Sequence, residues 1–164
     1  MPEAIIMGVD AALAATGIGV IKTAGDQAEV LDTELVRTSG KQQLARRIDK
    51  LYRSLCSKIE TYKPNILALE DIFYSKNIRI ALNLGQARGM AILASAQYDI
   101  DLYEFSAKEI KMAVTGNGAA SKQQVAFMVR TLLNLEDEFE TYDISDSLAV
   151  ALCAASRINL EVYL

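Results

Sequence analysis

The chain has 164 residues, of which 51% are hydrophobic and 23% are charged, and its formal net charge is −4. This length and composition predict one folded domain over residues 1–164 and exclude a chain that is disordered as a whole. The sequence contains no histidine, which excludes Ser-His-Asp and Cys-His catalytic systems and histidine-ligated metal centres. Any chemistry must therefore use carboxylates, lysines, hydroxyls or metals held by oxygen.

The cysteine content and the apolar runs exclude further classes of protein. Two cysteines, Cys56 and Cys153, cannot form a four-thiolate zinc site, and their apolar neighbours predict buried, reduced thiols. Residues 1–7 carry neither a basic leader nor a long apolar core, so we expect no signal peptide. The longest apolar run, Leu148–Ala155, is far shorter than the about 20 residues that span a bilayer. We expect a cytoplasmic protein with no membrane partner.

Positive charge is concentrated in the middle of the chain. Residues 37–88 contain eleven basic and four acidic side chains, whereas residues 1–36 contain six acids and one base and residues 133–164 seven acids and one base. The middle segment therefore predicts a surface on which a polyanion can bind. For Arg46, Lys50 and Arg53 alone, the solvent-exposed face of a helix also explains the pattern.

The first half of the chain predicts three strands and a helix. The apolar run Ala4–Val9, the β-like segment Gly17–Ile21 and the alternating segment Gln27–Val36 are expected to form an antiparallel meander. Apolar residues then recur at helical spacing over Gln42–Tyr62, and Pro64 closes this amphipathic helix.

The second half alternates strands and helices, which predicts an α/β fold without an internal repeat. The apolar run Ile66–Leu69 is typical of a central strand that is covered on both faces. The remaining expected elements are a helix rich in small residues at Ile80–Gln97, a strand at Leu102–Phe105, and helices at Lys108–Val114, Ser121–Leu133 and Asp143–Arg157.

Four carboxylates occupy positions that suggest chemistry. Asp10 and Glu70 stand at the carboxyl ends of two predicted core strands, the edge at which α/β sheets build their sites. Asp143 and Asp146 are spaced i, i+3, which places both on one face of the last helix. Because both lie near the start of that helix, capping is the alternative explanation for this pair.

If the last helix packs beside the first strand, all four carboxylates share one cleft. At about 5 Å and an effective dielectric constant of about 20, each pair repels by roughly 3 kcal/mol, so the cluster must bind cations or share protons. Oxygen ligands of this kind select Mg²⁺ or Mn²⁺, and two such ions about 4 Å apart support phosphodiester hydrolysis. This spacing alone is not specific for a nuclease, since carboxylates are common at strand ends.

Seven sequence blocks occur together in a familiar order. They are Gly8–Asp10, Thr16–Ile21, Glu70–Phe73, Leu84–Gly89, Lys122–Val125, Met128–Val129 and Asp143–Ala149. In this order they resemble the RuvC family of Holliday-junction resolvases, bacterial endonucleases of the ribonuclease-H-like fold, over nearly the whole chain. The Leu-Gly-Gln-Ala-Arg-Gly and Asp-x-x-Asp-x-Leu-Ala blocks are the specific parts of the resemblance.

The resemblance implies a fold, an activity and partners. The fold is a five-stranded mixed sheet, three antiparallel strands followed by two parallel ones, flanked by helices in a single nuclease domain. The activity is resolution of four-way DNA junctions in recombination and repair, by paired, metal-dependent phosphodiester hydrolysis with two Mg²⁺ ions per site, for which Mn²⁺ can substitute. The partners are junction DNA, a second copy of the chain and a branch-migration helicase complex, and the small residues of 80–97 mark the candidate dimer interface.

The resemblance also implies roles for individual residues. The catalytic and metal-binding acids fall on Asp10, Glu70, Asp143 and Asp146. Lys111 and Lys122 match lysines near the scissile phosphate, where a cation can neutralise developing charge. The other residues expected to bind DNA are Phe73, from the resemblance, and Lys76 and Arg79, from the basic middle segment. Phe73 matches an aromatic that stacks on an unpaired base, a contribution of roughly 1–3 kcal/mol; core packing for Phe73 and a solvent-exposed position for Lys122 are the structural alternatives.

The loop after the first strand departs from the family pattern. Where the family usually has Asp-Pro-Gly and a polar residue, this chain has Asp10 followed by five residues of which four are alanine, beginning with Ala11 and Ala12. Alanine in place of a glycine with positive φ costs about 1 kcal/mol or forces another turn. We therefore expect an altered loop with altered DNA contacts but a retained metal ligand.

Three other functions are weighed against the resolvase. A ribonuclease-H-like nuclease acting on RNA is the nearest alternative, and a catalytically weakened module that only binds branched DNA is another. An actin-like or sugar-kinase ATPase also begins with a Gly-x-Asp hairpin, but it needs glycine where this chain has alanine, and it has two domains.

Overall fold

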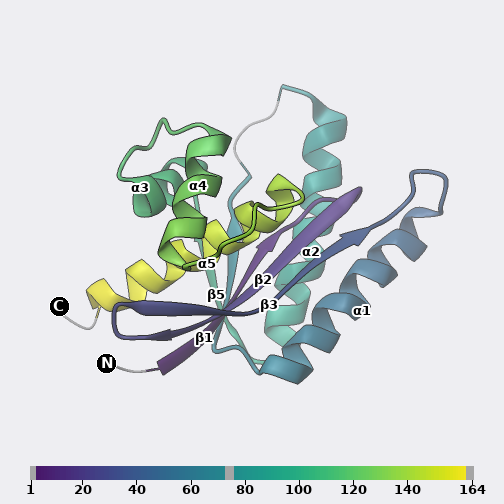
Figure 1. The fold of residues 1–164 in the computed structure, drawn as a ribbon. Coiled ribbons are helices and arrows are strands. Elements are labelled where there is room, and N and C mark those ends of the chain that lie inside the picture. Colours follow the sequence, from purple (N-terminus) through teal and green to yellow (C-terminus); the bar gives the residue numbers. More distant parts are fainter. Residues whose placement is uncertain (1–2, 73–75, 162–164) are drawn as a thin grey trace.

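The computed structural model describes residues 3–72 and 76–161. Its five strands are β1 (Glu3–Asp10), β2 (Ala15–Ala24), β3 (Gln27–Arg37), β4 (Ile66–Glu70) and β5 (Asp101–Phe105). They form one sheet in the order β3-β2-β1-β4-β5, in which β1, β2 and β3 are antiparallel neighbours while β4 and β5 run parallel to β1 (Figure 1). The predicted mixed sheet is confirmed.

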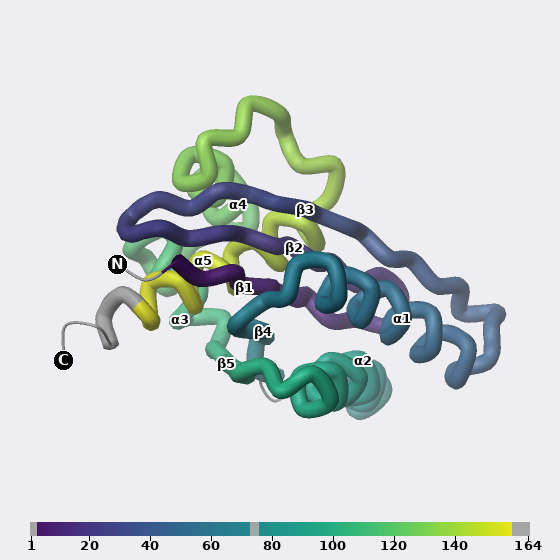
Figure 2. Tube along the Cα trace, turned by 90° about the horizontal axis from the view of Figure 1, so that it is seen from below, coloured from purple at the N-terminus to yellow at the C-terminus, as the bar shows by residue number. Residues whose placement is uncertain are grey.

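Helices cover both faces of this sheet (Figure 2). Helices α1 and α2 pack on one face, and α3, α4 and α5 pack on the other. Their bounds are α1 (Leu44–Tyr62), α2 (Ile78–Gln97), α3 (Ala107–Thr115), α4 (Lys122–Leu132) and α5 (Tyr142–Glu161). Every predicted element is present with its boundaries shifted by a few residues, as terminal turns commonly are.

Local sequence signals account for where the helices begin and end. Helix α1 buries Leu51, Leu55 and Ile59 on one face and ends at Lys63, which adopts a left-handed conformation before the proline. Helices α3 and α4 each begin with a capping box, Ser106 with Glu109 and Ser121 with Gln124. In a capping box the two side chains and the two backbone N–H groups satisfy one another, so both helix starts are fixed.

The two-residue period of the strands decides which side chains face α5. In β1 and β4, Ile6, Ile66 and Ala68 belong to the core beneath α5, whereas Met7 and Leu67 belong to the core beneath α1 and α2. By the same alternation, Asp10 and Glu70 project toward the α5 face at the carboxyl edge of the sheet. The sheet therefore delivers both acids to the side on which the last helix lies.

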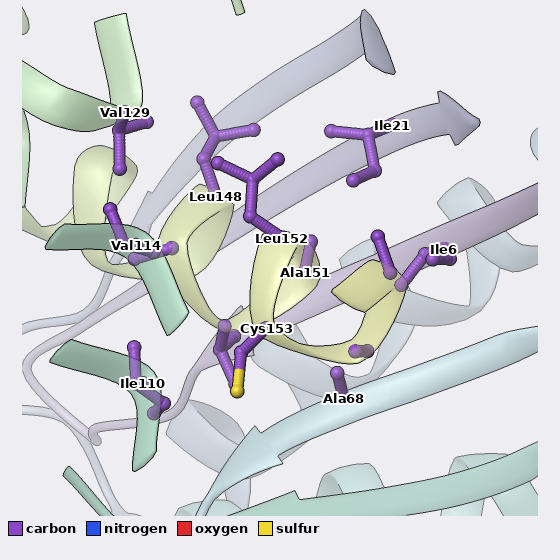
Figure 3. Close-up of a cluster of buried hydrophobic side chains, with 14 of the residues drawn as sticks. Ile6, Ile21, Ala68, Ile110, Val114, Val129, Leu148, Ala151, Leu152 and Cys153 are labelled. Atoms are coloured by element: carbon purple, nitrogen blue, oxygen red, sulfur yellow. The ribbon is translucent and has the colours of Figure 1, made fainter. Parts of the chain in front are cut away.

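Three glycines let α5 approach the sheet closely. A Cβ atom on Gly8 would lie 2.0 Å from the backbone oxygen of Ser147, and one on Gly17 would lie 2.2 Å from the backbone oxygen of Asp143. A Cβ atom on Gly19, which pairs with Gly8 across β1 and β2, would lie 2.7 Å from the side chain of Leu148. The rest of α5 then packs into the apolar core, with Ile6, Ile21 and Ala68 of the sheet beside it (Figure 3).

The structure also bears on the two cysteines and on the expectation of no membrane span. Both cysteines are free, but only Cys153 is buried, whereas Cys56 is partly exposed on α1 because its position lies beside the buried stripe and not on it. Over the ranges 3–72 and 76–161, no helix is long and apolar enough to cross a membrane.

The glycine contacts predict the effect of one added methyl group. Gly8→Ala should lower the free energy of unfolding by about 2–3 kcal/mol, because its Cβ collides with helix backbone that cannot move alone. Gly40→Ala is the matched control, since a Cβ at Gly40 meets no atom within 4 Å. Urea unfolding of both variants measures the difference, and equal stability of the two would contradict this account of the helix position.

Candidate active site

Three of the predicted acids line one open cavity at the carboxyl edge of the sheet. Asp10 of β1, Glu70 of β4 and Asp146 of α5 surround a space of about 250 Å³ together with Lys111 and Lys122. Asp10 and Glu70 also line an adjoining hollow of about 290 Å³, which extends toward Leu84 and Arg88 of α2. The two acids of the sheet therefore line two adjoining hollows.

Burial and mutual repulsion raise the proton affinity of these acids. The pKa of Asp10 rises to about 7, first because the carboxyl is buried and then because Asp146, Asp143 and Glu70 carry like charge nearby. Burial and the charge of Asp146 also raise the pKa of Glu70. Burial, followed by the charge of Asp143, raises the pKa of Asp146. Positive charge bound close to these carboxylates would therefore stabilise the cleft.

Two lysines supply part of that charge. Lys122, the first residue of α4, directs its Nζ to within 3.4 Å of Asp146 Oδ2, and this pairing raises the lysine's pKa. The charge of Lys122 lowers the pKa values of Asp10, Glu70 and Asp146, and the charge of Lys111 on α3 lowers those of Glu70 and Asp146. Helices α3 and α4 therefore aim one cation each at the acidic cleft.

Asp143 lies at the edge of the cluster. It occupies the first turn of α5, and its backbone carbonyl contacts Gly17. Its side chain does not line the cavity, but its charge acts on the pKa values of Asp10 and Asp146. The structure therefore gathers Asp10, Glu70 and Asp146 into the cleft and leaves Asp143 beside it.

The donor chemistry fits a hard divalent cation. Carboxylates whose pKa values are raised by neighbouring negative charge gain from binding a cation. Among the described residues, no group of three or more acidic or cysteine side chains is placed to hold one ion by itself. Mg²⁺ usually takes only one or two carboxylates and completes its shell with water and phosphate oxygens, so pairs of acids suit it.

Two further side chains near the cleft make contacts that the sequence did not predict. Arg88 of α2 donates from Nε to the backbone oxygen of Glu70 at 3.1 Å and pairs with Glu104 and Asp71, which fixes the end of β4. Tyr142 lies under the Lys122 ammonium, 5.8 Å from Nζ to the ring centroid. Arg88 belongs to the Leu-Gly-Gln-Ala-Arg-Gly block, whereas no sequence signal marks Tyr142.

The remaining predicted DNA-binding residues lie away from the acids or outside the described residues. Lys76 and Arg79 are exposed at the start of α2 and do not line either hollow. Phe73 lies outside the described residues, so its predicted stacking role stays a prediction.

The loop after β1 is held without a left-handed residue. Ala11 and Ala12 both have negative φ, so neither alanine is strained. Thr16 Oγ1 donates to the backbone oxygen of Ala12 at 2.8 Å, and Thr38 N donates to that of Ala14 at 3.0 Å. The sequence change therefore leads to a loop stabilised by two threonines, in place of a glycine turn.

An acidic cleft at the carboxyl edge of a sheet in this strand order places the chain among α/β proteins of the ribonuclease-H-like fold. Residues 6–154 match the family described as crossover junction endodeoxyribonuclease RuvC, and the chain belongs to this family.

Relatives and solved structures agree with this assignment. Crossover junction endodeoxyribonuclease RuvC of Desulforamulus reducens is 43% identical over 151 residues, which cover 92% of this chain and 93% of the relative. The protein of the same name from Geotalea uraniireducens is 43% identical over 156 residues, covering 95% and 91%. The structure of T. thermophilus RuvC in complex with Holliday junction substrate superposes with a TM-score of 0.92 at 26% identity and covers 96% of both chains.

The raised pKa of Asp10 predicts how stability depends on pH in metal-free buffer. Because the folded state binds a proton more tightly than the unfolded state, stability is lost as pH rises from about 4 to about 7. Asp10→Asn removes this loss, so at pH 8 the variant should be more stable than the wild type by about 2–4 kcal/mol, at about 1.4 kcal/mol per pKa unit.

Denaturant unfolding at pH 4, 6 and 8 with EDTA checks this difference. Asp99→Asn, a substitution of the same kind in the exposed turn after α2, is the control and should follow the wild type at every pH. A constant difference between Asp10→Asn and wild type across the three pH values would refute the electrostatic account of the cleft.

Proposed function

We propose that this chain is a single-domain endonuclease that resolves four-way DNA junctions in recombination and repair. The observation that carries the proposal is the cleft in which Asp10, Glu70 and Asp146 meet Lys111 and Lys122. Support comes from family membership and from the T. thermophilus relative, whose structure contains a Holliday junction substrate. A DNA backbone needs positive charge at the cutting site, and this cleft supplies two lysines together with carboxylates that gain from binding a cation.

The reaction that suits these residues is metal-dependent hydrolysis of a phosphodiester. We propose two Mg²⁺ ions, held by Asp10, Glu70, Asp146 and the adjacent Asp143, with Mn²⁺ as a substitute. Ions held there would supply Lewis-acid activation of the attacking water and of the leaving oxygen. The acids would hold the ions, while Lys122 and Lys111 are placed to bind the phosphate and to offset the negative charge that grows on it.

We propose that the DNA strand runs along the two adjoining hollows. Asp10 and Glu70 line both, so a phosphate beside them is reached from the α3–α4 side and from the α2 side. Lys76 and Arg79 at the exposed start of α2 are proposed to contact the backbone beyond the cleft, with Phe73 stacking on a base at the crossover. We also propose a branch-migration helicase partner, on the family resemblance alone.

The paired cuts at a junction require two active sites, and α2 offers a surface for a second copy. Ile78, Leu82 and Leu93 are exposed on one stripe of the helix at i, i+4 and i+15. Between them, a Cβ on Gly85 or Gly89 meets no atom within 4 Å, so this stripe is open to close approach. We propose that α2 packs against its equivalent in a homodimer.

A cleavage assay tests the proposed function. With Mg²⁺, the purified protein should cut a synthetic four-way junction by symmetric nicks in two strands and leave a linear duplex of equal length intact. Equal cutting of both DNAs, or binding of the junction without cutting, would overturn the proposal. An RNA–DNA hybrid in a parallel reaction distinguishes the alternative nuclease that acts on RNA.

The same assay tests the role of one acid. Asp146→Asn should lower the cleavage rate at least about 1,000-fold while junction affinity stays within about threefold, because a ligand for the ions is lost and no phosphate contact is removed. Asp137→Asn, in the exposed segment before α5, is the matched control and should cut normally. Loss of junction binding by Asp146→Asn would assign Asp146 a structural role instead.

The proposed dimer is tested by one charge placed on the α2 stripe. Leu82 is 60% exposed, and Leu82→Glu should convert the dimer to a monomer in sedimentation experiments, since two carboxylates would then face each other across the interface. Phe127→Glu on α4, at 64% exposure in the isolated chain, is the control and should leave the dimer intact. A dimer that survives Leu82→Glu would show that another surface joins the two copies.

A further inference from the structure

The cations of the described residues divide into those that pair with an acid and those that do not. The paired cations are Lys22, Arg53, Lys58, Arg88, Lys122, Arg130 and Arg157. Within 37–50, a segment described in full, five cations have no acidic partner, namely Arg37, Lys41, Arg46, Arg47 and Lys50. The one acid of this segment, Asp49, pairs with Arg53. We call these five residues the α1 cationic surface.

Hydrogen bonds attach this surface to the loop that follows the catalytic Asp10. Arg37 ends β3 in register with Ala15, at the sheet edge where β1 ends. The next residue, Thr38, binds the loop after β1 through the backbone oxygens of Leu13 and Ala14. Arg47 Nε donates to Thr38 Oγ1 at 2.8 Å, and Lys50 Nζ donates to the backbone oxygen of Arg37 at 2.8 Å. The surface is therefore continuous with the edge that carries the cleft.

Helix stability does not explain these cations. Arg46 and Arg47 lie in the first turn of α1, which contains no acid and has no side-chain cap. Positive charge at this end of a helix opposes the macrodipole and is unfavourable by a few tenths of a kcal/mol or more. By contrast, α3 and α4 begin with complete capping boxes. A helix start that is poor for folding and rich in unpaired cations is suited to a polyanion.

We propose that the α1 cationic surface binds the phosphate backbone of a duplex arm of the junction where that arm leaves the cleft. This inference rests on the proposed function. The adjacent loop, with Ala11, Ala12, Ala14 and Ala15, has no charge with which to hold the arm. The surface carries five positive charges immediately beyond that loop, so it extends DNA binding from the cut site toward the arm.

A double substitution tests the surface without touching its structural hydrogen bonds. Lys41→Gln with Arg46→Gln removes two exposed cations that hold no other group. Lys22→Gln with Lys63→Gln is the control. It makes the same charge change at two positions that lie near Ile5, at the opposite edge of the sheet. Thermal melting should show that both variants fold, and the first should not be less stable than the second.

Binding is measured for a four-way junction with long arms at several salt concentrations. The first variant should reduce the slope of log Kd against log salt concentration by about two and bind about ten- to fiftyfold more weakly at 0.1 M salt, since each phosphate contact contributes about 0.9 to the slope. The control should follow the wild type. With arms shortened to a few base pairs, the two variants should bind alike.

The cleavage rate at saturating junction separates this inference from the proposed function. It should be unchanged in the first variant, because the surface holds the arm and does not touch the reacting phosphate. Equal salt slopes for the two variants, an equal loss on short-arm junctions, or a tenfold fall in the saturated rate would each overturn the inference. A wild-type protein that leaves junctions uncut would instead refute the proposed function, while the salt slopes would still report on the surface.

Discussion

The close contact between α5 and the first two strands is the constraint on which the site depends. Gly8, Gly17 and Gly19 leave no Cβ atoms at the three positions of β1 and β2 where the first turns of α5 cross, so the helix lies directly on the sheet there. Only at this separation does the first turn of α5 reach the end of β1, where Asp10 projects. The acidic cleft therefore depends on the three glycines as much as on its own charged side chains.

The cleft balances two opposing electrostatic effects. Burial and like charge make Asp10, Glu70 and Asp146 costly to ionise together, whereas Lys111 and Lys122 lower that cost. The positive charge of the lysines offsets only part of this cost, since the pKa of Asp10 still rises to about 7. A site in this state gains from added positive charge and already holds two lysines, a combination that suits the proposed phosphodiester hydrolysis.

The sequence predicted what depends on local periodicity. Apolar alternation located the strands, and the acids at their carboxyl ends located the edge of the cleft, because parallel neighbours such as β1 and β4 end at the same side. Contacts between distant residues were not predictable in this way. The bond from Arg88 to the end of β4, the ring of Tyr142 beneath Lys122 and the threonines that hold the alanine loop depend on how elements pack. Cys56 was misplaced for the same reason, since one residue of rotation around α1 separates a buried from a partly exposed position.

Helix α5 also determines the separation between acids that are far apart in the chain. Asp10 and Glu70 are fixed to each other by the paired strands β1 and β4, whereas the distance from them to Asp146 depends on how deeply α5 is seated. Leu148 and Ala151, two and five residues beyond Asp146, meet the glycines of the sheet and so limit that seating by their size. Buried apolar residues thus set the spacing between the acid of α5 and the two acids of the sheet, and the geometry of the cleft becomes a property of the hydrophobic core.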